Sequence, residues 1–249
     1  MSVLEAKGLV KRFGGFLATN DVSIGFAQGA RHALIGPNGA GKTTLVNLLT
    51  GVLRPDVGTI LLEGRDVTGL PPHERVRLGL VRTFQINQLF SGLTPLESIL
   101  LAIAQRIDRK GDRWRPVARD DEAIREAVEL LTRLDLESVM TRPTATLAYG
   151  KRRLLEVALA LACRPRVLLL DEPAAGVPHG ERDEILNAIA LLPREVTVVL
   201  IEHDMDLVFR FAERISVLVN GALLMEGTPA EVAASRKVRE VYLGESLDG

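Results

Sequence analysis

The feature that most constrains this chain is a glycine-rich stretch, "LIGPNGAGKTTLVNLL", which lies between an apolar run and a helical pattern. It places Gly36, Gly41, Lys42 and Thr43 in the spacing Gly-x-x-x-x-Gly-Lys-Thr. Glycines allow backbone N–H groups to wrap phosphates, the lysine reaches the terminal phosphates, and the threonine hydroxyl ligates Mg²⁺. The alternative is a glycine-rich turn with an ordinary helix cap, which the strand-then-helix context disfavours. The stretch therefore predicts a site for a nucleoside triphosphate and Mg²⁺. The residues predicted to bind the nucleotide are Gly36, Pro37, Asn38, Gly39, Ala40, Gly41, Lys42, Thr43 and Thr44.

An acidic pair follows the apolar run "VLLLD" and opens "DEP". Asp171 ends a strand of the buried type, so its carboxylate is expected at the C-terminal edge of a sheet, where it can hold the Mg²⁺ shell. Glu172 comes next, on the opposite face or just past the strand end. An acidic pair at such a place is often only solvated. Behind a phosphate-binding loop, Glu172 is interpreted instead as the group that orients and polarises the attacking water.

His203 closes another apolar stretch, "VVLIEHD". If the two apolar strands are parallel neighbours, their ends bring His203 and Asp171 to the same edge of the sheet. A lone histidine after a strand is usually structural, but the neighbouring motifs favour a contact with the γ-phosphate. His32, His73 and His179 have no such context and are expected to be surface or packing residues.

Gln85 in "VRTFQ" is a polar residue at the end of a short apolar strand pattern. It is either a strand-end cap or a ligand of Mg²⁺ or of water that also senses the position of the helical segment after it. The second role suits a switch, because the amide can report whether the γ-phosphate is present. The predicted catalytic residues are Glu172, His203, Gln85 and Lys42, and the predicted metal ligands are Thr43, Gln85 and Asp171.

The overall composition excludes some classes of protein. The chain has 249 residues, a formal net charge of −1 and 25% charged residues, an ordinary globular balance. This charge gives no general attraction to nucleic acid or to a membrane surface. The chain does not open with a basic segment followed by an apolar one, so secretion is not predicted. The longest apolar runs fall far short of the roughly 20 residues of a membrane helix. We expect a soluble, cytosolic protein.

Strand-like and helical patterns divide the chain into segments. The first quarter alternates short strand patterns with glycine, as in a mixed or antiparallel sheet. The stretch "TPLESILLAIAQRI" opens with Thr-Pro, which is typical of a helix start, and "EAIREAVELLTRLDL" is amphipathic. The polar stretch "DRKGDRWRPVARDD" between them is expected to be a surface loop. Alternating strands and helices at both ends therefore enclose a helical insert.

Five stretches, in this order, resemble the nucleotide-binding subunit of ATP-binding-cassette (ABC) transporters: "GPNGAGKTT", "TFQ", "LAYGK", "VLLLDEP" and "LIEHD". The resemblance implies an α/β fold with a RecA-like P-loop ATPase core, an antiparallel β-subdomain and an inserted α-helical subdomain. It implies an ATP-binding catalytic core at residues 1–88 and 165–249, and a helical signature subdomain at residues 89–164. Phe13 in "KRFGG" matches the aromatic residue that stacks on adenine in the family, with a core phenylalanine as the alternative.

The stretch "LAYGK" matches the family's signature loop, usually written LSGGQ, at the start of a helix. In the family, two subunits meet head to tail, and each signature loop caps the ATP held by the other subunit. The resemblance therefore implies that Ala148, Tyr149 and Gly150 bind ATP in trans. Ala148 replaces Ser, Tyr149 replaces Gly and Lys151 replaces Gln. Because the helix N-terminus remains and Lys151 adds a positive charge, the loop is expected to work with altered γ-phosphate contacts.

Three stretches point to a subgroup of the family. "LAYG", "VRTFQINQLFSGLTPLESILLA" and the ending "GTPAEVAASRKVREVYLGE" resemble the LivG-type ATPase subunit of branched-chain amino-acid importers. This likeness implies a peripheral ATPase at the cytoplasmic face of the cell membrane, in a homo- or heterodimer with a second ABC ATPase subunit. It implies membrane permease subunits as partners, a solute-binding protein indirectly, and no nucleic acid. The family usually has Asp where this chain has Pro178, so a cross-interface carboxylate is missing.

A second hypothesis is a soluble, non-transport ABC ATPase that acts as a clamp or scaffold on nucleic acid or a protein assembly. Such proteins usually show tandem cassettes, long coiled coils or basic tails, and the sequence has none of these. A GTPase-like switch would need a guanine-specifying motif such as Asn-Lys-x-Asp, which is also missing. The sequence therefore favours an ATPase that energises import of a small solute.

Overall fold

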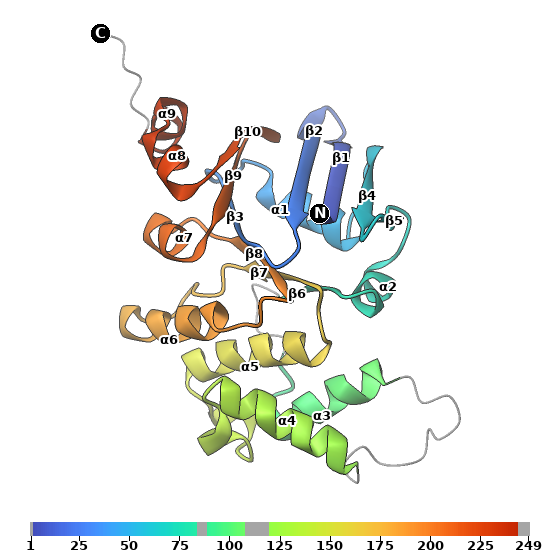
Figure 1. The fold of residues 1–249 in the computed structure, drawn as a ribbon, viewed down its shortest axis with the longest axis vertical. Coiled ribbons are helices and arrows are strands. Elements are labelled where there is room, and N and C mark those ends of the chain that lie inside the picture. The colour runs from blue at the N-terminus through green and yellow to red at the C-terminus, as the bar shows by residue number, and fades with distance from the viewer. Residues whose placement is uncertain (1, 84–88, 108–119, 244–249) are drawn as a thin grey trace. The chain divides into compact units, whose positions relative to one another are not determined.

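The computed structural model of the chain describes residues 2–83, 89–107 and 120–243, without the side chains of residues 179, 242 and 243. The chain forms two compact units, and each is described by itself (Figure 1). Unit 1 is Met1–Arg82, Arg166–Glu172 and Pro193–Gly249, and unit 2 is Thr83–Pro165 and Pro173–Leu192.

A small antiparallel sheet opens unit 1. Its strands are β1 (Ser2–Phe13), β2 (Phe16–Ala27), β4 (Val57–Leu62) and β5 (Arg65–Asp66), in the order β2-β1-β4-β5. β1 and β2 form a hairpin around the Gly14–Gly15 turn, which pairs Phe13 with Phe16. The first quarter was predicted to form a mixed or antiparallel sheet, and its first two strands are antiparallel, whereas residues 31–35 pair in parallel in the other sheet.

A second, larger sheet of unit 1 carries the apolar stretches that the sequence marks as strands. Its strands are β3 (Arg31–Ile35), β6 (Leu80–Arg82), β7 (Val167–Asp171), β8 (Thr197–Ile201), β9 (Arg214–Val219) and β10 (Ala222–Gly227). The order is β10-β9-β3-β8-β7-β6, parallel except for the β9–β10 hairpin. All residues of β3, β7 and β8 are buried, as expected of parallel strands covered on both faces.

Helices cover both faces of the larger sheet. The helix α1 (Lys42–Thr50) and the small sheet share one core with Leu34, Leu169 and Val199. Ala33 and Ile35 point to the opposite face, where the core includes residues of α7 (Met205–Phe211), α8 (Pro229–Ala234) and α9 (Arg236–Leu243). This alternation along β3 follows from the period of two in a strand.

A buried arginine fixes the far end of α1. Arg75 lies on α2 (Pro72–Arg77) and is 1% exposed. Its guanidinium donates to the carbonyls of Leu48 and Leu49 at 2.8 and 2.6 Å, and to those of Leu70 and Thr68 at 3.0 Å each. Burial lowers the pKa of Arg75 to about 10, which still leaves it charged near neutral pH. The last-turn carbonyls of α1, which a helix leaves without intrahelical partners, are therefore satisfied.

Unit 2 is helical. Its elements are α3 (Pro95–Arg106), α4 (Asp121–Arg133), the short 3₁₀ turns η2 (Glu137–Val139) and η3 (Thr144–Thr146), α5 (Tyr149–Ala162) and α6 (His179–Ala190). The helix α3 begins with a capping box between Thr94 and Glu97, followed by Pro95 at the first helical position. The predicted helix start at Thr-Pro is therefore confirmed. The surface loop predicted after α3 lies mostly outside the described residues.

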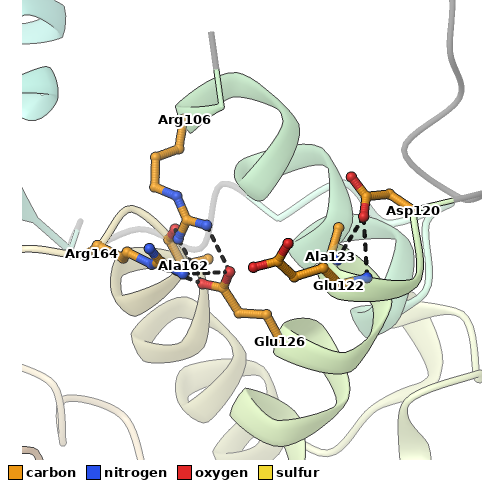
Figure 2. A network of polar contacts seen from close by, with 7 residues as sticks. All are labelled: Arg106, Asp120, Glu122, Ala123, Glu126, Ala162 and Arg164. Atoms are coloured by element: carbon orange, nitrogen blue, oxygen red, sulfur yellow. Dashed lines mark hydrogen bonds and ion pairs between the residues drawn. The ribbon is translucent and has the colours of Figure 1, made fainter. Parts of the chain in front are cut away.

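A cluster of ion pairs joins three helices of unit 2 (Figure 2). Arg106, at the end of α3, donates to both carboxylate oxygens of Glu126 on α4, at 2.6 and 2.7 Å. It also donates to the carbonyl of Ala162 at the end of α5, at 2.7 Å, and Arg164 pairs with the same Glu126 at 3.0 Å. This bidentate geometry fixes the helices more specifically than a point charge would.

The predicted α/β fold, with a parallel core sheet, an antiparallel sheet and helices between the motifs, is confirmed. The predicted division into residues 1–88 with 165–249 and residues 89–164 stays a prediction about function. By compactness, α6 belongs with α3, α4 and α5, although it follows the core strand β7 along the chain.

Candidate nucleotide site

The phosphate-binding stretch connects β3 to α1, as predicted. Gly41 adopts a φ of 97°, and a Cβ there would meet the Ala18 carbonyl oxygen at 2.6 Å. A Cβ on Gly36 would overlap the Leu218 carbonyl oxygen. Only glycine fits such close backbone approaches. Asn38 and Gly39 at the tip are exposed, so the loop presents backbone to solvent between two fixed glycines.

The first turn of α1 offers unsatisfied backbone N–H groups. No side chain caps the helix at Gly41, and its first turn contains no acidic residue. A helix N-terminus in this state favours an anion. Thr43 in this turn is exposed, and Thr44 is partly buried. The local geometry therefore suits phosphate oxygens.

Lys42 folds back over the loop. Its ammonium donates to the carbonyls of Gly36 and Pro37, at 2.6 and 3.1 Å. Burial lowers the pKa of this ammonium, and the carboxylates of Glu172 and Asp171 act in the opposite direction. Neutral carbonyl acceptors therefore hold the charge of Lys42 above the loop. The charge is close enough to both acidic residues at the end of β7 to interact with them electrostatically.

Asp171, the last residue of β7, is 7% exposed and bound by an arginine. Arg82 at the end of β6 donates to its Oδ2 at 2.5 Å and to Asn47 Oδ1 of α1 at 2.6 Å. The guanidinium thus bridges the acidic strand end and the phosphate-loop helix. Sequence reasoning missed Arg82 and Asn47, although a cation closing the short apolar run "LVR" was the available signal.

Glu172 and His203 lie side by side beyond the ends of β7 and β8. These strands are parallel neighbours in which Asp171 pairs with Ile201, so the predicted shared edge is confirmed. His203 Nδ1 is 3.4 Å from Glu172 Oε1. The backbone of Glu172 has a φ of 47°, a left-handed conformation that is uncommon for a residue other than glycine and occurs at functional sites.

A second carboxylate, on Glu202, stabilises the backbone at His203. It is 2% exposed, and its Oε2 accepts a hydrogen bond from the His203 backbone N–H at 3.2 Å. Burial raises the pKa of the Glu202 carboxyl, and the neighbouring Glu172 adds to the increase, while backbone hydrogen bonds from His203 and Asp204 oppose it. Sequence reasoning missed Glu202, because a charged residue directly after a strand is usually solvent-exposed.

The helix α5 begins at the "LAYGK" stretch. Its N-cap is Ala148, which makes no side-chain cap, and no acidic residue lies in the first turn. Lys151 forms an ion pair with Asp135 and donates to the Asp135 carbonyl at 3.0 Å, and its ammonium lies 3.9 Å from a carboxylate oxygen of Glu184. The positive charge that Lys151 adds is therefore paired within unit 2, while the backbone N–H groups of the first turn keep the polarity suited to an anion.

Both helix starts and the acidic end of β7 lie within the residues that one family model matches. A family model described as "ABC transporter" matches residues 19–175. The chain belongs to the ABC transporter family. A second model, described as "Branched-chain amino acid ATP-binding cassette transporter", matches residues 222–248, which include β10, α8 and α9.

Similar proteins cover almost the whole chain. It is 43% identical over 251 residues to the high-affinity branched-chain amino acid transport ATP-binding protein BraF of Pseudomonas aeruginosa, with 98% of each chain covered. It is 41% identical over 251 residues to the corresponding protein LivG of Escherichia coli, again with 98% of each covered. A crystal structure of the ADP conformation of an ATP-binding cassette of an ABC transporter superposes with a TM-score of 0.85 at 34% identity, covering 98% of this chain and 100% of that one.

The other residues that the resemblance to the ABC family singled out differ in where they lie. Phe13 is 48% exposed at the end of β1, with the Lys11 ammonium 5.8 Å from its ring centroid, so it is a surface and not a core phenylalanine. Phe16, across the same hairpin, is 65% exposed and was not singled out in the sequence. Gln85 lies outside the described residues. Pro178 is the residue before α6 and has no carboxylate to offer.

The remaining histidines separate as expected where the structure describes them. His32 is 1% exposed, contacts Phe26 edge-on and shares a hydrogen bond of 2.8 Å with Ser216. Burial lowers its pKa to about 4, so it is a neutral packing residue. His73 is exposed on α2. Neither lies with the nucleotide residues of the ABC family.

The donor set fits ATP with Mg²⁺. Carboxylate and hydroxyl oxygens are the ligands that Mg²⁺ prefers, and Asp171 and Thr43 supply one of each. Asp171 ends β7, and Thr43 lies in the first turn of the uncapped helix α1. Among the described residues, no group of three or more His, Cys, Asp or Glu side chains forms a metal cage.

In the part of the chain that the structure describes, none of the helices has the length and apolar character needed to cross a bilayer.

Proposed function

We propose that the chain is the ATP-hydrolysing subunit that energises import of branched-chain amino acids through partner membrane permeases. The observation that carries the enzymatic part is the pair of Glu172 and His203, 3.4 Å apart beyond the ends of two parallel strands. The observation that carries the transport part is 41–43% identity over nearly the full length to branched-chain amino acid transport ATP-binding proteins. The non-transport clamp or scaffold is not favoured by these relatives.

Each part of the site takes a defined role in this proposal. The backbone of Gly36–Thr44 wraps the ATP phosphates, and Lys42 exchanges its carbonyl acceptors for the terminal phosphate oxygens. Thr43, Asp171 and Gln85 would hold Mg²⁺, which would neutralise charge on the phosphates. Glu172 orients the attacking water, and His203 contacts the γ-phosphate. Phe13, exposed on the first hairpin, stacks on the adenine.

The site is completed by a second ATPase subunit. Ala148, Tyr149 and Gly150 of one subunit face the γ-phosphate held by the other, using the uncapped start of α5. The partner is a second copy or a different ABC ATPase. Because Pro178 cannot supply a carboxylate across the interface, the two ATP sites are coupled by other groups.

The proposed setting is peripheral, on the cytoplasmic face of the cell membrane. Permease subunits bind the ATPase there, and a solute-binding protein delivers the amino acid to them. Nucleic acid takes no part. These partners come from the names of the relatives and from the family resemblance.

The enzymatic part is tested with Glu172→Gln. We expect this variant to bind ATP, to dimerise at saturating ATP in light scattering, and to hydrolyse ATP at least about 100-fold more slowly, because the water is no longer polarised. Glu195→Gln, at an exposed position before β8, is the matched control and should keep the parental rate. A Glu172→Gln protein that stays monomeric with ATP would refute the composite site.

The transport part is tested by affinity purification from gently solubilised native membranes. Two multi-span permeases and a second ABC ATPase should copurify with the tagged chain. Proteoliposomes containing that complex should then transport leucine, isoleucine or valine only when ATP is present on the side of the membrane to which the chain is bound. Copurification of soluble proteins or nucleic acid alone would contradict the transport role.

A further inference from the structure

Tyr149, the first residue of α5, is tied to a distant segment of unit 2. Its phenol donates a hydrogen bond to the backbone carbonyl of Ala175 at 3.0 Å. The guanidinium carbons of Arg152 and Arg153 lie 5.7 and 5.5 Å from the centre of its ring. Cations at this distance from an aromatic ring attract it, so the ring has two supports and the hydroxyl has a fixed acceptor.

Two glycines permit the close approach of these segments. Gly176 has a φ of +72°, and a Cβ there would lie 3.1 Å from the Tyr149 hydroxyl oxygen. In the reverse direction, a Cβ on Gly150 would lie 2.5 Å from a carboxylate oxygen of Glu181, in the first turn of α6. The start of α5 and the segment 175–181 therefore fit together through a glycine on each side.

A buried arginine reinforces the same acceptor. Arg153 is 3% exposed and donates to the Ala175 carbonyl at 3.4 Å, a weaker bond than that of the phenol. It also pairs with Glu156 at 2.9 Å, which holds its guanidinium near the tyrosine ring. The Ala175 carbonyl is thus the point at which α5 holds the segment that follows β7.

The position of Ala175 in the chain gives this tie its consequence. The chain passes from unit 1 to unit 2 between Glu172 and Pro173. Ala175 is therefore only three residues beyond Glu172, and Pro173 between them restricts the backbone. A displacement of the α5 start would reach the Glu172 backbone through this short connection.

We propose that Tyr149 is a positioning residue for ATP hydrolysis, which links the signature loop at the start of α5 to Glu172 of the same subunit. The inference rests on the proposed composite site, in which the start of α5 meets the nucleotide of the partner subunit. When that nucleotide engages the turn, the phenol carries the displacement to Ala175 and sets the orientation of Glu172. This link supplies a coupling that Pro178 cannot make through a side-chain carboxylate.

Tyr149→Phe removes only the hydroxyl and tests the link. We expect kcat for ATP hydrolysis to fall about three- to tenfold, the range that one hydrogen bond supports. The affinity of the monomer for a fluorescent ATP analogue should not change, because the phosphate-binding loop lies in the other unit. The unfolding temperature should fall by no more than about 4 °C. A merely structural role would lower stability without this selective loss of kcat.

A second variant tests the same link from the other side of the hydrogen bond. Gly176→Ala should lower kcat at least as much as Tyr149→Phe, since its methyl group pushes against the phenol. If the two residues act through one link, the double variant should be no slower than Gly176→Ala alone. Multiplication of the two losses in the double variant would overturn the proposal, and so would a parental kcat in Tyr149→Phe.

Failure of the link and failure of the composite site give different results. In a Glu172→Gln background, adding Tyr149→Phe should leave ATP-driven dimerisation intact, because the backbone N–H groups of α5 are unchanged. Dimerisation of Glu172→Gln together with a parental kcat for Tyr149→Phe would refute only the link. A Glu172→Gln protein that never dimerises would refute the composite site on which the link depends.

Discussion

Two pairs of helices in this chain begin in contrasting ways. The helices α3 and α8 each start with a complete capping box, Thr94 with Glu97 and Thr228 with Glu231. The helices α1 and α5 start with neither a side-chain cap nor an acidic residue in the first turn. Since a cap stabilises a helix by about 1 kcal/mol, leaving it out has a cost that needs a compensating reason. The helices α2 and α6 also lack a side-chain cap, but each has an acidic residue in its first turn. The starts of α1 and α5, which have neither and are called uncapped below, are the two that the proposed function places against phosphate.

The two uncapped starts also differ from each other. The turn before α1 is shaped by glycines, and Lys42 is held by carbonyls of its own loop. The start of α5 is held by side chains, namely Tyr149 on Ala175 and Lys151 on Asp135. A glycine-shaped loop is fixed by local backbone, whereas the start of α5 depends on partners far along the chain. The predictions below test this difference.

The largest effect is expected for Lys42→Met. Removing the ammonium above the phosphate loop should lower kcat about 100-fold or more, because a preorganised charge at the reacting phosphate is lost. Steady-state hydrolysis measures this change. Lys237→Met, at an exposed position on α9, is the matched control. A kcat within twofold of the parent would remove Lys42 from the catalytic residues.

Gly41→Ala should break the α1 loop. The new Cβ would approach the Ala18 carbonyl and would need a φ of 97°, so we expect the free energy of unfolding to fall by about 3 kcal/mol. Gly64→Ala is the control, since Gly64 has a φ of 77° but open space around its Cβ. It should lose only about 1 kcal/mol. Equal losses in denaturant titrations would show that close packing adds nothing at Gly41.

Ala148→Asp should convert α5 into a capped helix. The carboxylate would satisfy first-turn N–H groups and stabilise unit 2 by about 1 kcal/mol, while lowering kcat about tenfold by repelling the phosphate of the partner subunit. Stability and hydrolysis should thus change in opposite directions. Ala148→Ser adds a neutral cap and should keep its kcat. An Asp variant that is both more stable and fully active would argue against a phosphate at α5.

Thr94→Ala should have the smallest effect, a loss of about 1 kcal/mol in the free energy of unfolding with kcat unchanged. Thr228→Ala provides the same test at α8. A hydrolysis defect in either variant would contradict the division between capped, structural starts and uncapped, phosphate-facing ones.

The capping boxes also predict a pH dependence. Hydrogen bonds from the Thr94 backbone and side chain lower the pKa of Glu97 below its ordinary value of 4.5. The ionised carboxylate therefore stabilises the folded state above pH 4.5, and this contribution is lost as the pH falls through the lowered pKa. The difference in thermal unfolding between Thr94→Ala and the parent should accordingly become smaller in acid, although the hydrogen bond from the Glu97 N–H to the Thr94 hydroxyl remains. A difference between them that grows on acidification would reverse the sign and refute the assignment.

Sequence reasoning was most effective where structure is local. The phosphate loop, the Thr-Pro helix start and the buried strand ending at Asp171 each follow from a few adjacent residues, and all three lie where predicted. The shared edge of Asp171 and His203 also followed, because it needed only that two apolar strands be parallel neighbours.

Long-range partners were beyond reach. Arg82 meets Asp171 across 89 positions and Tyr149 meets Ala175 across 26, and no periodicity in the sequence encodes either pairing. Lys151 illustrates the same limit, since its ion pair with Asp135 could not be read from the sequence. The roles of the individual site residues stay predictions until the variants above are measured.

The contacts of Arg75 have a consequence for the kinetics of nucleotide binding. Because its guanidinium holds the last carbonyls of α1, this helix cannot fray from its C-terminal end. The entropy of ordering α1 is therefore lost during folding and not during binding. Amide hydrogens beyond the first turn of α1 should exchange slowly even without ATP, and nucleotide should associate in a single fast phase, since no slow ordering step precedes capture.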